Sequence, residues 1–292
     1  MKRKAFTITE LLVVIAIIAV LLGIALPALN QAKKSAKVMA ERSTLSNMEL
    51  AIEAFKNDHG YYPESVPRTN LLEEFQGGPG PEDQGAHRLA EALLGLDLLG
   101  YEENHYYKVE DGSITGTLPE GTPLVWSDGA GGFVEAKRHG PYMDSSDVKV
   151  GTMGRNVRSG DVPAAHPGST NFPDGVSNPN YVFLDNLEYD QPRPILYYRA
   201  RRSGRSLGTI YDYSHNAEIT MDVFGGGLSY PTFDDPTGYE FGYFIWDPRT
   251  GPVDEPTARP HNKDTFLLIG AGFDHVYGTE DDITNFPVEM DK

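Results

Sequence analysis

Cysteine is absent from this chain of 292 residues. Its absence excludes disulfide bonds, thiol catalysis and metal sites built on thiolates. The folded state must therefore be stabilised by its hydrophobic core, by partner subunits or by an ion held through oxygen ligands. The compartment stays open, because an exported protein can fold without disulfides.

Positive charge is scarce. The chain has 25 basic and 42 acidic residues, which gives a formal net charge of -17. A surface of this sign repels phosphate backbones and argues against a nucleic-acid partner. The densest basic cluster is interpreted as a solvated turn, with contact to an acidic neighbouring subunit as the alternative. Its members are Arg199, Arg201, Arg202 and Arg205.

Catalytic motifs lack the context that their chemistry requires. The eight histidines are scattered, and none is paired at the i, i+4 spacing of a zinc-binding helix. Residues 204–208 match the G-x-S-x-G nucleophile elbow, but residues 209–213 favour a strand where that motif needs a helix. We therefore expect a hairpin turn at 204–208, a surface role for His275, no catalytic residues and no enzymatic activity.

Helical periodicity is sparse beyond the N-terminal region. Gly and Pro number 31 and 21, and the only other helix-like apolar spacing covers residues 89–99, before a glycine at position 100. Short apolar runs between turn residues predict strands at 105–109, 181–184, 195–198, 209–213, 239–246 and 266–269. The pattern predicts an α+β fold in which an antiparallel sheet with long loops wraps around one long helix.

One hydrophobic run dominates the N-terminal region. Residues 11–29 are almost unbroken Leu, Val, Ile and Ala, and 19 residues of helix suffice to cross about 30 Å of hydrocarbon. Three basic residues precede the run, at positions 2–4. Because basic flanks stay on the cytoplasmic side, we expect everything after the run to lie outside.

Three hypotheses compete for this segment: a cleaved secretory signal, an ordinary signal anchor and a prepilin leader. Glu10 separates them, because a carboxylate at the start of a membrane helix is costly in lipid and has no use in the first two. In a filament subunit the acid can pair with the N-terminal amine of a neighbour after the leader is removed.

The first ten residues resemble the class III signal of type IV pilins and type II secretion pseudopilins. Both have a short basic leader, a small residue, Phe, an acid four positions later and an apolar helix. The resemblance implies that prepilin peptidase cuts between Ala5 and Phe6, that the new Phe6 amine is N-methylated, and that Glu10 takes the family's acidic position. The sequence departs from the family at Ala5, where Gly is usual.

The resemblance also implies a domain plan and a location. The leader is 1–5, the long helix is 6–58 with 6–30 in the membrane or filament core, and the head is 59–292. The chain would be a single-pass bacterial inner-membrane protein with a cytoplasmic N-terminus and a periplasmic head. Its partners would be membrane lipid, prepilin peptidase, an inner-membrane assembly platform and other pilin-like subunits of a homo- or hetero-oligomeric filament.

Three functions fit this resemblance. The first is a structural subunit, or pseudopilin, of a type II secretion pseudopilus, and absence of cysteine together with an acidic C-terminal loop favours it. The second is a major or minor subunit of a type IV pilus. The third is a membrane-tethered binding protein or enzyme that uses a prepilin-type leader.

The helix is expected to continue beyond the membrane as an amphipathic segment. Pro27 should bend it or release a backbone carbonyl, and Gly60 should end it. Four apolar residues at steps of three and four predict the face that packs on the head. They are Leu45, Met48, Ile52 and Phe55.

Carboxylates crowd a C-terminal loop at residues 270–285. Asp274, Glu280, Asp281 and Asp282 surround Gly278, and such oxygen ligands on a glycine-containing backbone suit Ca²⁺. The spacing differs from that of an EF-hand. The loop resembles the C-terminal calcium loop of major pseudopilins, which implies a Ca²⁺ cofactor; a solvated acidic hairpin turn is the alternative.

Overall fold

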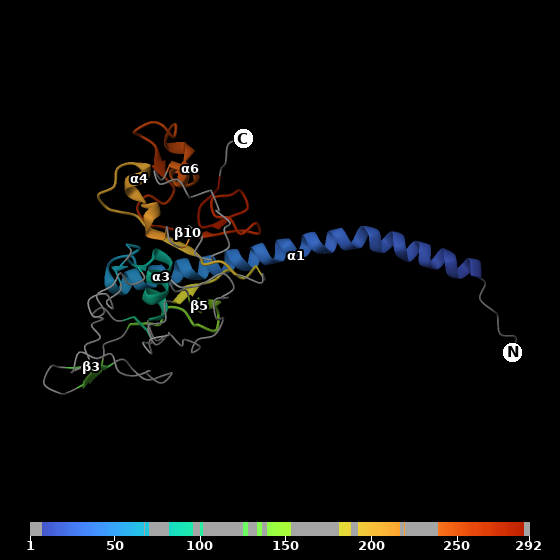
Figure 1. Ribbon diagram of the computed structural model, residues 1–292, viewed down its shortest axis with the longest axis horizontal. Coiled ribbons are helices and arrows are strands. Elements are labelled where there is room, and N and C mark those ends of the chain that lie inside the picture. Colours follow the sequence, from blue (N-terminus) through green and yellow to red (C-terminus); the bar gives the residue numbers. More distant parts are fainter. Residues whose placement is uncertain are drawn as a thin grey trace.

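The computed structural model consists of a long helix with a head built around its C-terminal half (Figure 1). It describes residues 8–66, 68–69, 82–95, 100–101, 125–127, 133–135, 139–152, 181–187, 192–216, 219 and 239–288. The α+β, lollipop-like layout expected from the sequence is confirmed. The expected strand at 105–109 lies outside the described residues.

Helix α1 (Ile8–His59) is 52 residues long, about 80 Å at the helical rise, which confirms a long N-terminal helix; positions 6 and 7 of the expected 6–58 lie outside the described residues. It runs through Pro27 without interruption and is curved in Figure 1. It ends where predicted, because Gly60 adopts a left-handed φ of 79° and its N–H donates to the Lys56 carbonyl at 2.7 Å.

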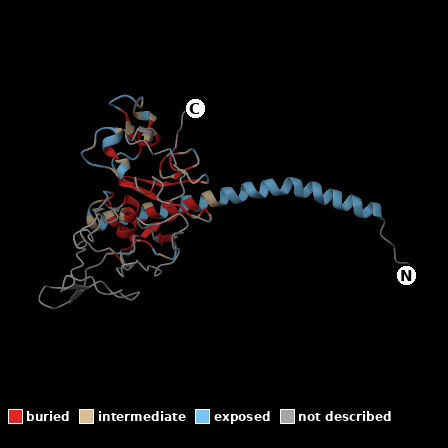
Figure 2. Ribbon diagram, in the orientation of Figure 1, coloured by how far each residue is buried: buried red, intermediate tan, exposed pale blue. Residues whose placement is uncertain are grey.

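The two halves of α1 have opposite surroundings. Every residue from position 8 to position 36 is exposed, whereas the second half enters the head (Figure 2). The apolar face predicted from spacing is confirmed, because its four side chains are at most 2 % exposed. They are Leu45, Met48, Ile52 and Phe55.

Strands in the described residues form five small antiparallel sheets, where the sequence predicted a single sheet around the helix. The largest has the order β11-β10-β7, from β7 (Leu196–Arg199), β10 (Phe266–Gly270) and β11 (Ile283–Thr284). The others pair β1 (Arg68–Thr69) with β2 (Glu82–Asp83), β3 (Val125–Ser127) with β4 (Phe133–Glu135), β5 (Val150–Thr152) with β6 (Tyr181–Phe183), and β8 (Trp246–Asp247) with β9 (Arg259–Pro260).

The three-stranded sheet is covered on both faces. Tyr197 and Leu268, which are paired across β7 and β10, belong to the cluster that includes α1 and α3 (Gly85–Leu94). Their neighbours Tyr198 and Leu267 belong to a second cluster, on the opposite face, with α4 (Leu207–Ile210) and α6 (Tyr239–Ile245). Burial of both faces explains why β7 and β10 lack polar alternation.

Three predicted elements differ from the structure. The helix expected at 89–99 is α3, which ends at Leu94 because Gly95, with φ of 85°, donates its N–H to the Glu91 carbonyl at 2.8 Å. The strand predicted at 209–213 is wrong, because α4 ends at Ile210 and the 3₁₀ helix η1 (Tyr213–Asn216) begins at Tyr213. The strand predicted at 239–246 is wrong over most of its length, which α6 occupies; β8 begins at Trp246, and the 3₁₀ helix η2 (Pro248–Thr250) follows it.

Local hydrogen bonds and packing explain the wrong strand predictions. The Thr209 hydroxyl accepts the N–H groups of Arg205 and Ser206, both at 2.9 Å, which fixes a helical first turn in place of an extended chain. In α6, Phe241, Phe244 and Ile245 are buried at helical spacing. Their aromatic and β-branched character favours strands only when no helical packing site is available.

A cluster of polar contacts fastens α1 to the head where the helix becomes buried. The Glu41 carboxylate, with no exposed area, accepts the N–H of Asn186 at 2.8 Å, and the Asn186 amide donates to the Thr44 hydroxyl at 3.3 Å. Burial raises the pKa of Glu41 to about 7; the Asn186 N–H and Lys149 oppose this rise, and Asp185 adds to it. The helix-head junction therefore contains an acid that folding makes harder to ionise.

We expect Leu45→Ala to lower the free energy of unfolding by roughly 2–5 kcal/mol, because it leaves a cavity between α1 and the sheet. Leu50→Ala, on the same helix, is the matched control and should change it by less than about 0.5 kcal/mol, since Leu50 is 69 % exposed and Leu45 only 2 %. Denaturant unfolding of the full chain in detergent measures both, and equal losses would contradict this packing.

We expect Glu41→Gln to change the pH dependence of stability. The pKa of Glu41 rises from its ordinary value of 4.5 to about 7, so the folded state holds a proton that the unfolded state releases in this window. Wild-type stability therefore falls as pH rises from about 4.5 to 7, by up to about 3 kcal/mol from this group. Unfolding free energies measured across this range should show the glutamine variant gaining on the wild type.

Leu50→Gln is the control for that comparison, because Leu50 is exposed on the same helix and its replacement adds and removes no ionisable group. Its difference from the wild type should stay nearly constant over the same pH range. A constant difference for Glu41→Gln as well would mean that Glu41 does not titrate differently in the folded and unfolded states.

Candidate functional site

The N-terminal half of α1 is an apolar surface without cover in the single chain. Its large side chains are about half exposed or more from Ile8 to Leu29, and the segment projects away from the head (Figure 2). A continuous apolar surface of this length is unstable in water and requires lipid or protein neighbours. Among the described residues, α1 is the one helix long and apolar enough to cross a membrane.

Glu10 lies in the first turn of α1 and is exposed. A carboxylate in this position interacts favourably with the unpaired N–H groups of the helix N-terminus. No other acidic residue occurs in α1 before Glu41, so one carboxylate stands at the entrance of the apolar segment and the next is buried in the head. Ala5 and Phe6, the expected processing site, lie outside the described residues.

The acidic loop connects β10 to β11 and is compactly folded. Gly272 has φ of 59°, and a Cβ atom there would come within 2.5 Å of the Asp281 carbonyl oxygen, so only glycine permits this close approach. The loop is anchored to the head by Tyr277, whose hydroxyl donates to the Pro194 carbonyl at 2.5 Å. The turn therefore has a defined shape set by backbone constraints and by a buried tyrosine.

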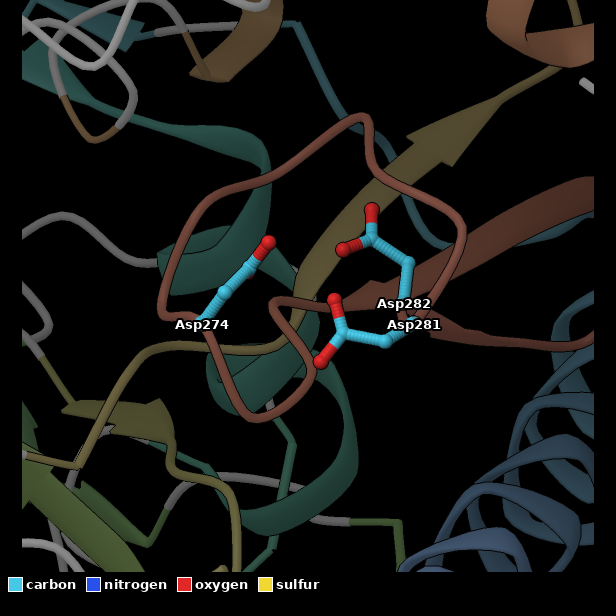
Figure 3. Close-up of side chains that lie close together, drawn as sticks. All are labelled: Asp274, Asp281 and Asp282. Atoms are coloured by element: carbon cyan, nitrogen blue, oxygen red, sulfur yellow. The ribbon is translucent and has the colours of Figure 1, made fainter. Parts of the chain in front are cut away.

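Three of the four predicted carboxylates meet in this loop. Asp274, Asp281 and Asp282 can each offer an oxygen so that the three atoms lie within 4.8 Å of one another (Figure 3). Glu280 is exposed and is not part of the group. His275 has a positive φ of 62° and is half-buried, and it also lies outside the group.

Backbone hydrogen bonds orient each carboxylate. Asp274 accepts the N–H of Val276 at 2.8 Å, Asp281 accepts that of Phe273 at 2.6 Å, and Asp282 accepts that of Gly278 at 2.7 Å. The N–H donors belong to the same loop as the carboxylates, so these hydrogen bonds hold both the side chains and the loop backbone in place. These bonds satisfy only part of the acceptor capacity of three carboxylates.

The electrostatics of the three carboxyl groups differ. Burial raises the pKa of Asp282 to about 8, with Asp274 and Asp281 adding to the rise. Burial also raises the pKa of Asp274. Burial also acts to raise the pKa of Asp281. Hydrogen bonds from the Thr279 hydroxyl and the Phe273 N–H outweigh this effect, so the pKa of Asp281 is lowered. Closely spaced carboxylates of this kind are mutually unfavourable when ionised.

The donor set is chemically suited to a hard cation. Three carboxylates converge on a tight, glycine-containing turn, and Ca²⁺ takes six to eight oxygen ligands in flexible geometry. The three side chains would provide part of such a coordination shell, and backbone carbonyls of the loop and water molecules would have to provide the rest. Asp274, Asp281 and Asp282 are therefore the described residues of this loop that could hold such an ion.

The serine motif at 204–208 is a turn that leads into α4, and Ser206 is exposed at its start. The predicted hairpin is wrong, because a helical turn follows. The Ser206 and Thr209 hydroxyls are hydrogen-bonded to each other at 2.8 Å. Ser206 therefore serves to order the first turn of α4.

A serine-histidine contact that sequence patterns could not reveal lies in the head. Ser65 and His215, 150 positions apart, are hydrogen-bonded at 2.8 Å through Nδ1, and Arg201 lies 3.2 Å from Nε2. Because a guanidinium only donates, Nε2 must accept, and the proton of neutral His215 is on Nδ1. Nδ1 then donates to Ser65, so His215 cannot remove its proton, and the pair orders the structure.

Burial supports this protonation state, since it lowers the pKa of His215 to about 4, with Arg201 acting in the same direction and Asp212 against it. The Ser65 hydroxyl also accepts the N–H of Arg199 at 2.9 Å, which links the segment after α1 to β7. No local sequence signal points to this contact, because its partners come from distant parts of the chain.

Comparison with known proteins bears on the N-terminal segment. Residues 1–26 match the family model of the prokaryotic N-terminal methylation motif. No curated protein and no solved structure matches the chain. The match supports a prepilin-type leader, as in type IV pilin-like substrates of prepilin peptidase, and the exposed apolar half of α1 is the segment within the described residues that could anchor the chain in a membrane.

Proposed function

We propose that this protein is a structural subunit of a type II secretion pseudopilus, assembled through α1 after cleavage and N-methylation by prepilin peptidase. The observation that carries the proposal is the combination of the methylation motif at 1–26 with a helix whose apolar half is wholly exposed in the single chain. Such a surface can be held first by lipid and later by the same surface of neighbouring subunits.

Glu10 provides the charge chemistry of assembly. Cleavage between Ala5 and Phe6 creates an amine at the start of an apolar helix, where an unpaired charge is costly. In the filament, Glu10 of one subunit neutralises the Phe6 amine of another. Such a buried pair sets the register between helices as much as it stabilises them.

The head and its acidic loop favour the secretion filament over a type IV pilus. The chain has no cysteine, and the carboxylates of the loop are arranged around a turn that suits an oxygen-ligated ion. A type IV pilus subunit would use the same N-terminal chemistry and is the alternative. In either case the role is structural, with the head on the periplasmic side of the inner membrane and the N-terminus on the cytoplasmic side.

We expect Glu10→Ala to leave the protein in the membrane and to abolish its incorporation into filaments, because the Phe6 amine then has no partner in the apolar core. The measurement is the fraction of chain in sheared filaments against the membrane fraction. Normal incorporation of the variant would refute this mechanism of assembly.

The control is the N-terminus of the same variant, determined by intact mass. Wild type and Glu10→Ala should both start at Phe6, so that loss of filaments is not a failure of cleavage. An unprocessed wild-type chain, or cleavage within the apolar segment, would contradict the filament proposal itself.

We also propose that the acidic loop binds Ca²⁺ through Asp274, Asp281 and Asp282. Convergence of three carboxylates on a short turn supports the proposal. A bound ion would stabilise the loop between β10 and β11, and this matters for a head whose chain has no disulfides. Glu280, the fourth residue predicted for this site, lies outside this carboxylate group, and its part in ion binding stays a prediction.

We expect Ca²⁺ to raise the unfolding temperature of the head and a chelator to lower it, with about 2.7 kcal/mol of stabilisation when the free ion is at 100 times its dissociation constant. Asp274→Asn should abolish this shift without large loss of basal stability, since Asp274 is exposed. Asp264→Asn, on a surface turn, is the control and should retain it. An unchanged unfolding temperature with Ca²⁺ would show that the loop is a solvated turn.

A further inference from the structure

Three lysines occupy the turn of α1 that follows the apolar segment. Lys33, Lys34 and Lys37 are the first charged residues after Glu10. At 100° per residue their positions fall within about 100° of the helix circumference, so they share one side. We call these three residues the lysine collar. It is unusual in a chain whose formal charge is -17.

Helix geometry places the collar at the depth of the lipid phosphates. With Glu10 at one boundary, about 20 residues of helix cross the 30 Å hydrocarbon layer and end near residue 30. Lys33 and Lys37 then lie about 5 and 10 Å beyond that boundary. The headgroup layer on each side is roughly 5–8 Å thick, so flexible lysine side chains reach it.

The head begins at the same position along α1 as the lysine collar. The Lys34 ammonium lies 4.5 Å from the ring centroid of Phe273, in the acidic loop, and the Lys37 ammonium donates to the Leu187 carbonyl at 3.4 Å. No spacer therefore separates the apolar segment from the head. The part of the head next to Phe273 carries the carboxylates of the acidic loop. An anionic membrane surface would repel these carboxylates unless positively charged residues lay between the loop and the membrane.

We propose that the lysine collar binds the phosphate groups of anionic lipids in the leaflet on the head side of the membrane and seats the head on that surface. The collar is at the end of the apolar segment opposite the basic leader at positions 2–4, so the rule that retains positive charge on the cytoplasmic side does not account for it. Juxtamembrane lysines attract anionic headgroups, and the attraction weakens with salt. The inference needs membrane insertion of α1 and does not depend on filament assembly.

The test is the lipid preference of the full processed chain in vesicles of phosphatidylcholine that contain phosphatidylglycerol as the anionic lipid. Spin-labelled lipids report the relative association of phosphatidylglycerol and phosphatidylcholine with the protein. Wild type should prefer phosphatidylglycerol, and the preference should fall as salt rises. Replacing all three lysines with Gln should reduce the preference to about one, since each contributes up to roughly fivefold.

Two further variants separate lipid binding from loss of structure. Replacing the three lysines with Arg keeps the charge and should keep the preference. Lys33→Gln alone leaves the contacts of Lys34 and Lys37 in place and should lower it. Thermal unfolding of each variant shows whether the head has remained folded.

The matched control removes three positive charges from the head, by changing Arg202, Arg205 and Lys263 to Gln. All three are exposed and lie in surface turns. This variant should keep the wild-type preference. A collar variant with undiminished preference, or an equal loss in the control, would overturn the proposal; failure of filament assembly would leave the lipid result unaffected.

Discussion

The structure depends on the burial of one face of α1 against α3 and the three-stranded sheet. Phe55 and Met48, together with Leu45 and Ile52, lie in the cluster that also contains residues of α3, β7 and β10. Because the same helix continues before this cluster into an exposed segment whose residues 11–29 are almost wholly apolar, the head is attached to a segment that water cannot accommodate. The helix α1 therefore both completes the core of the head and requires lipid or neighbouring subunits to cover its N-terminal half.

The charged residues of α1 are placed according to the environment of each turn: lipid, water or the interior of the head. Glu10 stands before the apolar segment, Lys33 to Lys37 follow it, and Glu41 is buried where the head begins. The cost of placing a charge in lipid accounts for the uncharged interval. At Glu41 the hydrogen bond from the Asn186 N–H offsets only part of the cost of burial, which is why the pKa of this acid is raised. The acidic loop lies beside this junction through the contact of Phe273 with Lys34, so an ion bound there would act on the part of the head nearest the membrane.

The tight loop and the buried polar contacts have a common physical role in a chain without disulfides. Ser65, His215 and Arg199 join the segment after α1 to β7, and Tyr277 joins the acidic loop to Pro194. Each buried polar group in these contacts has a partner, which is the condition under which such groups specify a structure instead of weakening it. The contact of Arg201 with Nε2 of His215 places the proton of the neutral ring on Nδ1, which faces Ser65.

Local pattern by itself determined the long helix, its buried face and its end at Gly60, because helical spacing and a left-handed glycine are properties of neighbouring residues. It also predicted the strands β6, β7 and β10, whereas the roles assigned to Glu10 and to the acidic loop stay predictions. It failed at α4 and α6, where side-chain caps and a second packing layer outweighed the strand preference of Thr209, Tyr211 and Phe244. Only the tertiary structure decided which carboxylates converge and which histidine meets which serine, because the first depends on the exact fold of the loop and the second joins residues 150 positions apart.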